Sequence, residues 1–261
     1  MKSVSIVGLG WLGLPLAQYL KQQGWAVKGT KQTEDDAQAM KKLGIDCYLF
    51  TLTQSEFPSE IVQAEALVIN IPPNATNVAH YVVGIKRLIS HGILQKVRYI
   101  LFVSSSSVFP QQDGVFDEQS LTVGSDVSSQ ALIELETWLL SLDITCDILR
   151  LAGLFGQARH PVKYLAGKTD LTAGSQPVNL VHLNDVIGAI ELLLNRPQGQ
   201  RIFNLCAPSH PTRESYYTQA AKRLGLPPPH FTKENRGIQR IIDGSKICRE
   251  LGFQYQHDLI D

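Results

Sequence analysis

A glycine-rich stretch near the start of the chain, VSIVGLGWLGLPLA, constrains the fold more than any other part of the sequence. Its apolar residues 4–7 are typical of a buried strand, and leucines recur at helical spacing over 12–23. Between the two segments, Gly8, Gly10 and Gly13 fall in G-x-G-x-x-G register. This spacing permits a tight turn, a close approach of a pyrophosphate to the backbone, and packing of the helix on the strand. The stretch therefore predicts a strand–turn–helix unit that binds a dinucleotide at the helix N-terminus.

Two other interpretations of this stretch are disfavoured. Lys2 followed by an apolar run is also typical of a secretory signal peptide, but the run continues into Gln18, Tyr19 and Lys21 without a small-residue cleavage site. A chance grouping of glycines would not require a strand before them and a helix after them. We therefore expect no secretory leader and a functional nucleotide-binding turn.

Composition narrows the range of partners. The 261 residues include 24 Lys and Arg and 24 Asp and Glu, and this zero net charge argues against a nucleic-acid or anionic-membrane partner. No apolar run is long enough to cross a bilayer. The cysteines are far apart and form no C-x-x-C pair, so we expect free thiols in a reducing cytoplasm and no metal site.

Strand-like apolar segments alternate with helical patterns along the whole chain. This alternation predicts a doubly wound α/β fold, a parallel sheet with helices on both faces that binds its ligand beyond the carboxyl ends of the strands. The expected strands are 4–8, 25–30, 46–52, 66–73, 97–107, 145–156, a short segment near 180 and 201–208, and the expected helices are 12–23, 34–43, 78–91, 128–141 and one that ends near 195.

The end of the second strand bears on the choice of cofactor. NAD-binding sheets carry an acid there for the ribose 2′-hydroxyl, but Thr30, Lys31 and Gln32 stand here and no acid occurs before Glu34. A cation favours a 2′-phosphate that a carboxylate would repel, so we expect NADP rather than NAD, with NAD left open. Further cofactor contacts are expected from the turns that follow the first, fourth and fifth strands, at Trp11, Leu12, Asn70, Ile71, Pro72 and Ser104.

Four segments together resemble the extended short-chain dehydrogenase/reductase family of nucleotide-sugar epimerases and dehydratases. SSSSVFP at 104–110 is similar to the family's S-S-S/T-x-x-V-Y-G, and LRLAGLFG at 149–156 to its L-R-x-x-x-x-Y-G. NLVHLNDV at 179–186 resembles V-H-V-x-D-V, and DGSKICRELGF at 243–253 resembles D-x-S-K-x-x-x-x-L-G-F/W. With the glycine-rich stretch, the matches follow the family order over nearly the whole chain.

The resemblance implies roles for the serines after the fifth strand. Ser105 lies three positions before Val108, where the family places its catalytic Ser or Thr. Its neighbour Ser106 is then expected to face a substrate, as are Arg159 and His160 after the sixth strand. The implied chemistry is hydride transfer with a nicotinamide on a nucleotide sugar or a similar polar small molecule.

The catalytic Tyr and Lys of that family, four residues apart after the fifth strand, are missing. No Tyr or Lys occurs between Tyr99 and Lys163, which holds for any alignment. Tyr164 and Lys168 have the right spacing but follow the sixth strand, so we interpret them as a coincidence. The chain thus resembles an atypical branch of the family. The Tyr position holds Val127 or Ser128, and the Lys position holds Ala131 or Leu132.

These features predict an extended Rossmann fold and leave two functions open. Residues 1–157, completed by 179–205, are expected to bind the nucleotide, and 158–178 with 206–261 to form a small substrate lobe. The chain is then either an NADP-dependent epimerase/dehydratase-like enzyme or a non-catalytic NADP(H) sensor, as a monomer or homodimer. The glycine-rich stretch also resembles UDP-sugar 6-dehydrogenases, but no cysteine follows a Gly-rich motif suited to their nucleophile.

Overall fold

The computed structural model describes residues 2–74, 78–156, 159–233 and 236–259. The chain divides into two compact units, each described here by itself. Unit 1 comprises Met1–Val108, Val123–Arg150 and Ile187–Ile202, and unit 2 comprises Phe109–Thr122, Leu151–Val186 and Phe203–Asp261. No described helix is both long and apolar enough to span a membrane.

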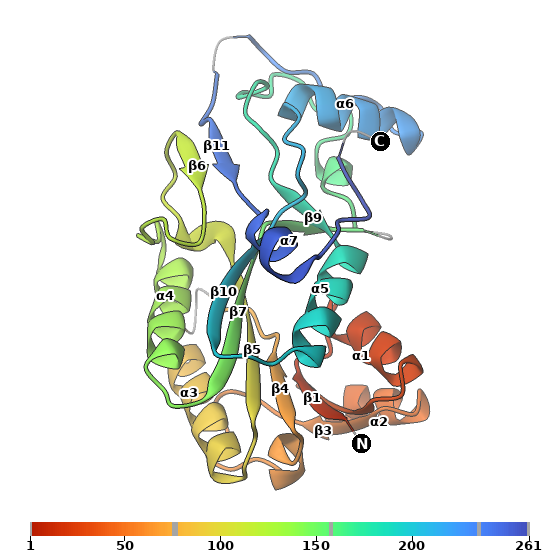
Figure 1. The fold of residues 1–261 in the computed structure, drawn as a ribbon. Helices are drawn as coiled ribbons and strands as arrows, with labels where there is room; N and C mark the ends of the chain where they lie inside the picture. The colour runs from red at the N-terminus through yellow and green to blue at the C-terminus, as the bar shows by residue number, and fades with distance from the viewer. Residues whose placement is uncertain (1, 75–77, 157–158, 234–235, 260–261) are drawn as a thin grey trace. The chain divides into compact units, whose positions relative to one another are not determined.

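A seven-stranded parallel sheet forms the framework of unit 1, as the sequence predicts (Figure 1). Its strand order is β10-β7-β5-β4-β1-β2-β3. From β1 the chain adds strands outward on one side through β2 to β3, and from β4 it adds them on the other side. Where the two sides meet, Ile6 of β1 is in register with Gly29 on one side and Val68 on the other. The strands are β1 (Ser3–Val7), β2 (Ala26–Lys31), β3 (Asp46–Leu49), β4 (Ala66–Ile69), β5 (Tyr99–Ser105), β7 (Thr145–Leu151) and β10 (Gln200–Leu205).

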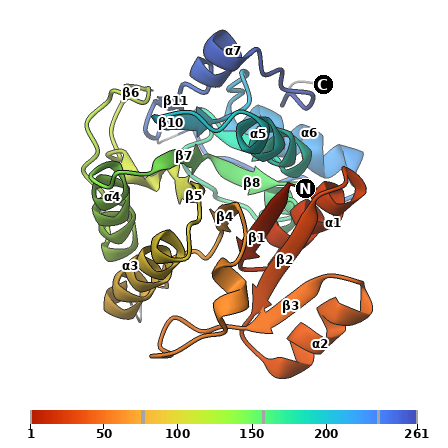
Figure 2. The same cartoon turned by 60° about the horizontal axis from the view of Figure 1, so that its bottom comes forward.

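Helices cover both faces of this sheet (Figure 2). On one face, Tyr19 of α1 donates a hydrogen bond of 2.6 Å to Glu191 of α5. On the other face α3 packs against α4, where Lys86 and Glu134 form an ion pair at 2.6 Å. The helices are α1 (Gly13–Gln22), α2 (Glu34–Lys42), α3 (Val78–Leu94), α4 (Val127–Leu140) and α5 (Leu183–Asn195).

The expected strand at 145–156 is wrong in one respect, because it is interrupted at Ala152. β7 ends at Leu151, and residues Gly153–Phe155 form β8, which pairs in parallel with β9 (Leu180–His182) in a separate sheet. The Ala152 amide donates a hydrogen bond to the Leu205 carbonyl oxygen, whereas the Gly153 amide donates to the Asn179 carbonyl oxygen. The chain therefore changes hydrogen-bonding partner between two successive residues.

Unit 2 contains elements that the sequence analysis did not predict. β6 (Gly114–Phe116) pairs in parallel with β11 (Arg240–Ile242), which places Phe109–Thr122 in unit 2 rather than in the expected nucleotide-binding segment. The remaining elements are η4 (Pro161–Tyr164), α6 (Arg213–Arg223) and α7 (Lys246–Leu251). A core of buried side chains from β8, η4, α6 and the C-terminal segment holds this unit together, including Phe155, Val162, Tyr216, Tyr217 and Leu259.

Candidate functional site

The turn between β1 and α1, residues 8–13 and called the glycine turn below, requires glycine at its first position. Gly8 has φ of +104°, a conformation that side chains rarely adopt. A Cβ there would lie 2.7 Å from the Asn70 carbonyl oxygen, so the neighbouring strand also leaves no room. The Gly8 amide donates to the Thr30 hydroxyl at 2.9 Å, which fastens the turn to β2.

The other two glycines of this turn differ in their surroundings. A Cβ on Gly13 would lie 2.1 Å from the Gly8 carbonyl oxygen, so this position is closed by the packing of α1 on the turn. A Cβ on Gly10 would meet nothing within 4 Å. Packing therefore explains Gly13 but not Gly10, whose open face is what a cofactor pyrophosphate needs in order to reach the backbone.

The N-terminus of α1 is suited to an anion. The helix has no side-chain cap at Leu12 and no acid in its first turn. The Leu14 amide already donates to the Gly10 carbonyl oxygen at 3.0 Å, and Pro15 has no amide hydrogen, so this terminus attracts a phosphate group mainly through the positive end of the helix dipole. Leu12 is buried and Trp11 is partly buried, so these two residues contribute mainly the path of the backbone to the turn.

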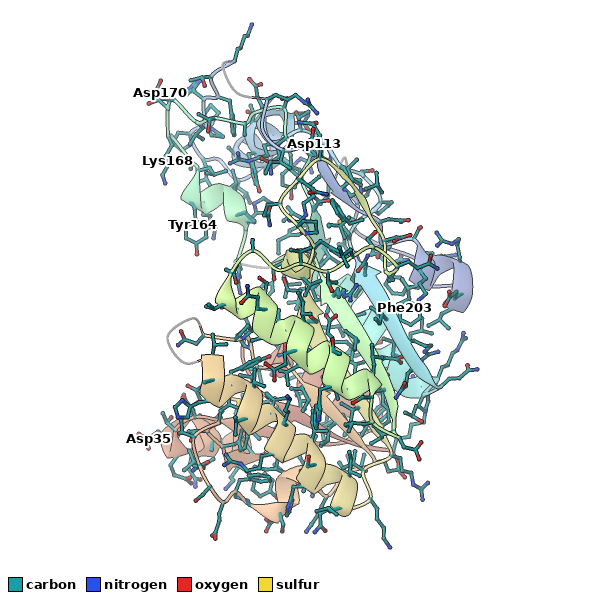
Figure 3. All side chains as sticks on the ribbon, turned by 90° about the vertical axis from the view of Figure 1, so that its left-hand side faces the viewer. Asp35, Asp113, Tyr164, Lys168, Asp170 and Phe203 are labelled. Carbon is teal, nitrogen blue, oxygen red and sulfur yellow. The ribbon has the colours of Figure 1, made fainter. Side chains whose placement is uncertain are left out.

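At the end of β2 the structure brings one cation to the edge of the sheet. Thr30 is 2% exposed, and its hydroxyl oxygen already accepts a hydrogen bond from the Gly8 amide. Lys31 is partly exposed and Gln32 is exposed, and no ion pair of Lys31 is found among the described residues. Acids do follow at once in the first turn of α2, where Asp35 points outward (Figure 3).

The loop after β4 is tied to the glycine turn. The Asn70 side chain donates to the Gly8 carbonyl oxygen at 3.2 Å, and the Tyr81 hydroxyl donates to the Ile71 carbonyl oxygen at 3.0 Å. Tyr81 itself is buried in α3. Pro72 is exposed beyond this anchored part. The expected cofactor residues of β1, β2 and β4 therefore lie together at the carboxyl edge of the sheet.

The serines after β5, Ser104–Ser107 and called the serine turn below, differ in what they bind. Ser104 is 5% exposed and donates to the Glu136 carboxylate at 2.5 Å. That carboxylate also forms an ion pair at 2.6 Å with Arg150 of β7, and both side chains are nearly buried. Glu136 belongs to no recognisable motif, so the sequence analysis did not identify it.

Ser105 retains a partly exposed hydroxyl at the end of β5. Its oxygen accepts a hydrogen bond of 3.1 Å from the Ser107 amide, which holds the side chain against its own turn. Ser106 follows as the first residue of η3 (Ser106–Val108) and is also partly exposed. Ser105 can therefore still donate its hydroxyl hydrogen to a bound molecule.

The first turns of α4 offer no proton-transfer group. Asp126 and Ser129 form a capping box that fixes where the helix starts. Of the positions that align with the missing Lys, Ala131 and Leu132 are each 3% exposed. The two acids on α4, Glu134 and Glu136, are both held in ion pairs.

Tyr164 and Lys168, the pair set aside in the sequence, lie at the surface of unit 2. Tyr164 is 74% exposed, and both side chains extend outward from the segment after β8 (Figure 3).

Arg159 and His160, the expected substrate residues, belong to the same unit, where Arg159 is exposed. The His160 side chain lies 3.1 Å from the Tyr216 hydroxyl, and burial, with Lys163 and Arg223 nearby, lowers its pKa. Within the described part of the chain no cluster of three potential metal ligands occurs.

Comparisons with known proteins agree with this geometry. Residues 3–116 match the family model of the NAD binding domain of 6-phosphogluconate dehydrogenase. Protein YeeZ of Escherichia coli K12 is 45% identical, over 98% of this chain and 97% of its own.

Two solved structures share the fold at low identity. A short-chain dehydrogenase/reductase superfamily protein from Agrobacterium tumefaciens with bound NAD is 16% identical, with a TM-score of 0.82 over 98% of this chain and 93% of its own. MoeE5 in complex with UDP-glucose and NAD is 18% identical, with a TM-score of 0.81 over 98% and 94%. The chain therefore has a Rossmann fold shared with short-chain dehydrogenase/reductase superfamily structures, its residues 3–116 resemble an NAD binding domain, and it belongs to the family of Protein YeeZ.

Proposed function

We propose that this protein is an NADP(H)-binding enzyme that acts on a nucleotide sugar or similar polar substrate, by oxidising or epimerising a hydroxyl-bearing carbon or by reducing the corresponding carbonyl. The observation that carries the proposal is the open face of Gly10 between two glycines closed by packing. Packing alone would not demand a glycine there, whereas contact with a pyrophosphate does. The UDP-glucose and NAD bound by MoeE5, which has the same fold, support the choice of substrate class.

The chain's own residues have distinct parts in binding the cofactor. The glycine turn and the N-terminus of α1 hold the pyrophosphate, and Asn70 keeps the β4 loop against that turn. Lys31, at the end of β2, binds the 2′-phosphate that distinguishes NADP from NAD. Three of the four free cysteines are buried, in keeping with a reducing cytoplasm.

Ser105 is proposed to orient the reacting oxygen of the substrate by donating its hydroxyl hydrogen. When bound, the nicotinamide supplies the hydride acceptor or donor. Ser105 alone is too weak a base to take the hydroxyl proton, because a serine needs an activating partner. Glu136 does not serve as that partner, since Ser104 and Arg150 occupy its carboxylate. We therefore assign the proton to water, at a rate about 10²–10⁴-fold below that of an enzyme with a positioned acid/base.

Calorimetric titration with NADPH, NADP, NADH and NAD tests the cofactor assignment. We expect the phosphorylated forms to bind at least tenfold more tightly, about what one charge-assisted contact provides. Binding of UDP-glucose to the NADP-loaded protein then tests the substrate class. If no dinucleotide binds, both the enzyme and the sensor function described next are wrong.

The missing Tyr and Lys favour a second candidate, a non-catalytic NADP(H) sensor. Such a protein needs the glycine turn but no proton-transfer group. The two candidates separate in a single-turnover assay with NADPH or NADP and a panel of nucleotide sugars. Nicotinamide absorbance that changes with any sugar, or recovery of a sugar with inverted configuration, supports the enzyme. Tight cofactor binding with neither change across the panel supports the sensor.

A further inference from the structure

A small cavity is lined wholly by residues of unit 2. Its volume is about 220 Å³, below the roughly 300–1,000 Å³ of sites for drug-sized ligands. It is bounded by the end of β8, by α6 and by the C-terminal segment, which runs beside α6 (Figure 1). A space of this size suits a small metabolite.

One wall of the cavity is apolar. Phe155 and Leu259 are 8% and 3% exposed and belong to the core of unit 2. Leu224, after the end of α6, is 49% exposed and completes the wall on the solvent side. Burial of a hydrocarbon group against these side chains would be favourable.

A hydroxyl donor is available on the same cavity. The Val162 amide donates to Nδ1 of His160 at 3.2 Å, so the neutral ring carries its hydrogen on Nε2. Nε2 lies 3.1 Å from the Tyr216 oxygen and donates to it. The Tyr216 oxygen is thus an acceptor in this contact, and its own hydrogen finds no acceptor among the residues that the structure describes.

The cavity also carries one charge of each sign. The Arg223 guanidinium, at the end of α6, is exposed and close enough to act electrostatically on both His160 and Tyr216. Asp258 Oδ1 accepts from the amides of Ser209 and Leu259, whereas the one donor to Oδ2 among the described residues is the Ser209 hydroxyl. No ion pair joins Arg223 to Asp258 in the described part of the chain, so each charge keeps capacity for a ligand.

We propose that this cavity binds a small zwitterion with an apolar side chain, of the α-amino acid class. The carboxylate of the ligand contacts Arg223 and the Tyr216 hydroxyl. Its ammonium contacts Oδ2 of Asp258, and its side chain packs on Phe155 and Leu259. Each polar group of the cavity then has a partner of the right kind, and the apolar wall is covered as well.

Calorimetry on the full chain tests this proposal without any cofactor, so its outcome is independent of the proposed function. The ligands are L-phenylalanine and L-leucine, which bracket the size of the side chain, with 3-phenylpropanoate and phenethylamine as analogues lacking one charge. We expect at least one amino acid to bind with a Kd of about 1 mM or tighter. The loss of either charged group should weaken binding about tenfold.

Two variants of neighbouring cations sharpen the test. Arg223→Gln should weaken amino-acid binding about tenfold, whereas Lys222→Gln, which removes the same charge from the same helical turn without lining the cavity, should not. Tyr216→Phe should weaken binding about threefold while keeping the ring in the core. The proposal is overturned if neither amino acid binds at about 10 mM, if 3-phenylpropanoate and phenethylamine bind as well as L-phenylalanine, or if the two cation variants behave alike.

Discussion

The glycine turn and the serine turn stand at the same carboxyl edge of the central sheet but use different parts of the chain. The glycine turn works through backbone groups, and its one open position, Gly10, faces free space. The serine turn works through side chains, and Ser104 is already bound to Glu136 in a buried ion-pair network. Cofactor binding and proton transfer therefore depend on separate features, so a chain can keep the first without the pair of side chains that the second requires.

The largest effect is expected when the buried ion pair behind the serine turn is broken. Arg150→Met leaves the Glu136 carboxylate buried without its cation, which should lower the free energy of unfolding by about 3–5 kcal/mol in denaturant titrations. A double variant, Arg150→Met with Glu136→Met, should recover most of this loss because no unpaired charge remains. A loss below about 1 kcal/mol in the single variant, the value of an exposed pair, would contradict the buried network.

The second prediction separates the two kinds of glycine within the glycine turn. Gly13→Ala should lower the free energy of unfolding by about 1–3 kcal/mol, because its Cβ meets a backbone oxygen. Gly10→Ala should change stability by less than about 0.5 kcal/mol, since its Cβ enters open space.

Dinucleotide affinity, measured by calorimetry, should respond strongly to Gly10→Ala, although the stability of the protein should not. A methyl group on this open face would stand where the pyrophosphate must reach the backbone, so affinity should fall at least about tenfold. Unchanged affinity would mean that the glycine turn is only architecture, despite its open face.

The third prediction concerns the cation beside the glycine turn. Lys31→Asp should lower the affinity for NADPH about tenfold or more without lowering that for NADH, because only NADPH carries the 2′-phosphate and a carboxylate at this position can accept a hydrogen bond from the ribose 2′-hydroxyl of NADH. Lys42→Asp, with the same charge change at the end of α2, serves as the control. An intact preference for NADPH in Lys31→Asp would contradict the role given to this side chain.

The sequence predicted what local pattern determines. Glycine spacing and the apolar strands located the glycine turn, and the order of strands and helices predicted the parallel sheet. Glu136 was missed because its contacts with Ser104 and Arg150 join three elements, which no spacing along the chain reveals. The pairing of β6 with β11 was missed because each strand has three residues, too few for an alternating pattern to stand out.

The smallest expected effect returns to the serine turn. Ser105→Ala removes one neutral hydrogen bond to the substrate, so once an activity is established, kcat/KM should fall about threefold to tenfold. Cofactor affinity should stay the same, because the glycine turn is untouched, and Ser105→Thr should restore activity because it keeps the hydroxyl. The Ser107 amide also loses its acceptor in the alanine variant, so a fall in thermal stability that accompanies the fall in kcat/KM would indicate that Ser105 only shapes the turn. A fall in NADPH affinity without a fall in kcat would instead indicate that this hydroxyl contacts the cofactor. Cofactor binding would then not be confined to the glycine turn.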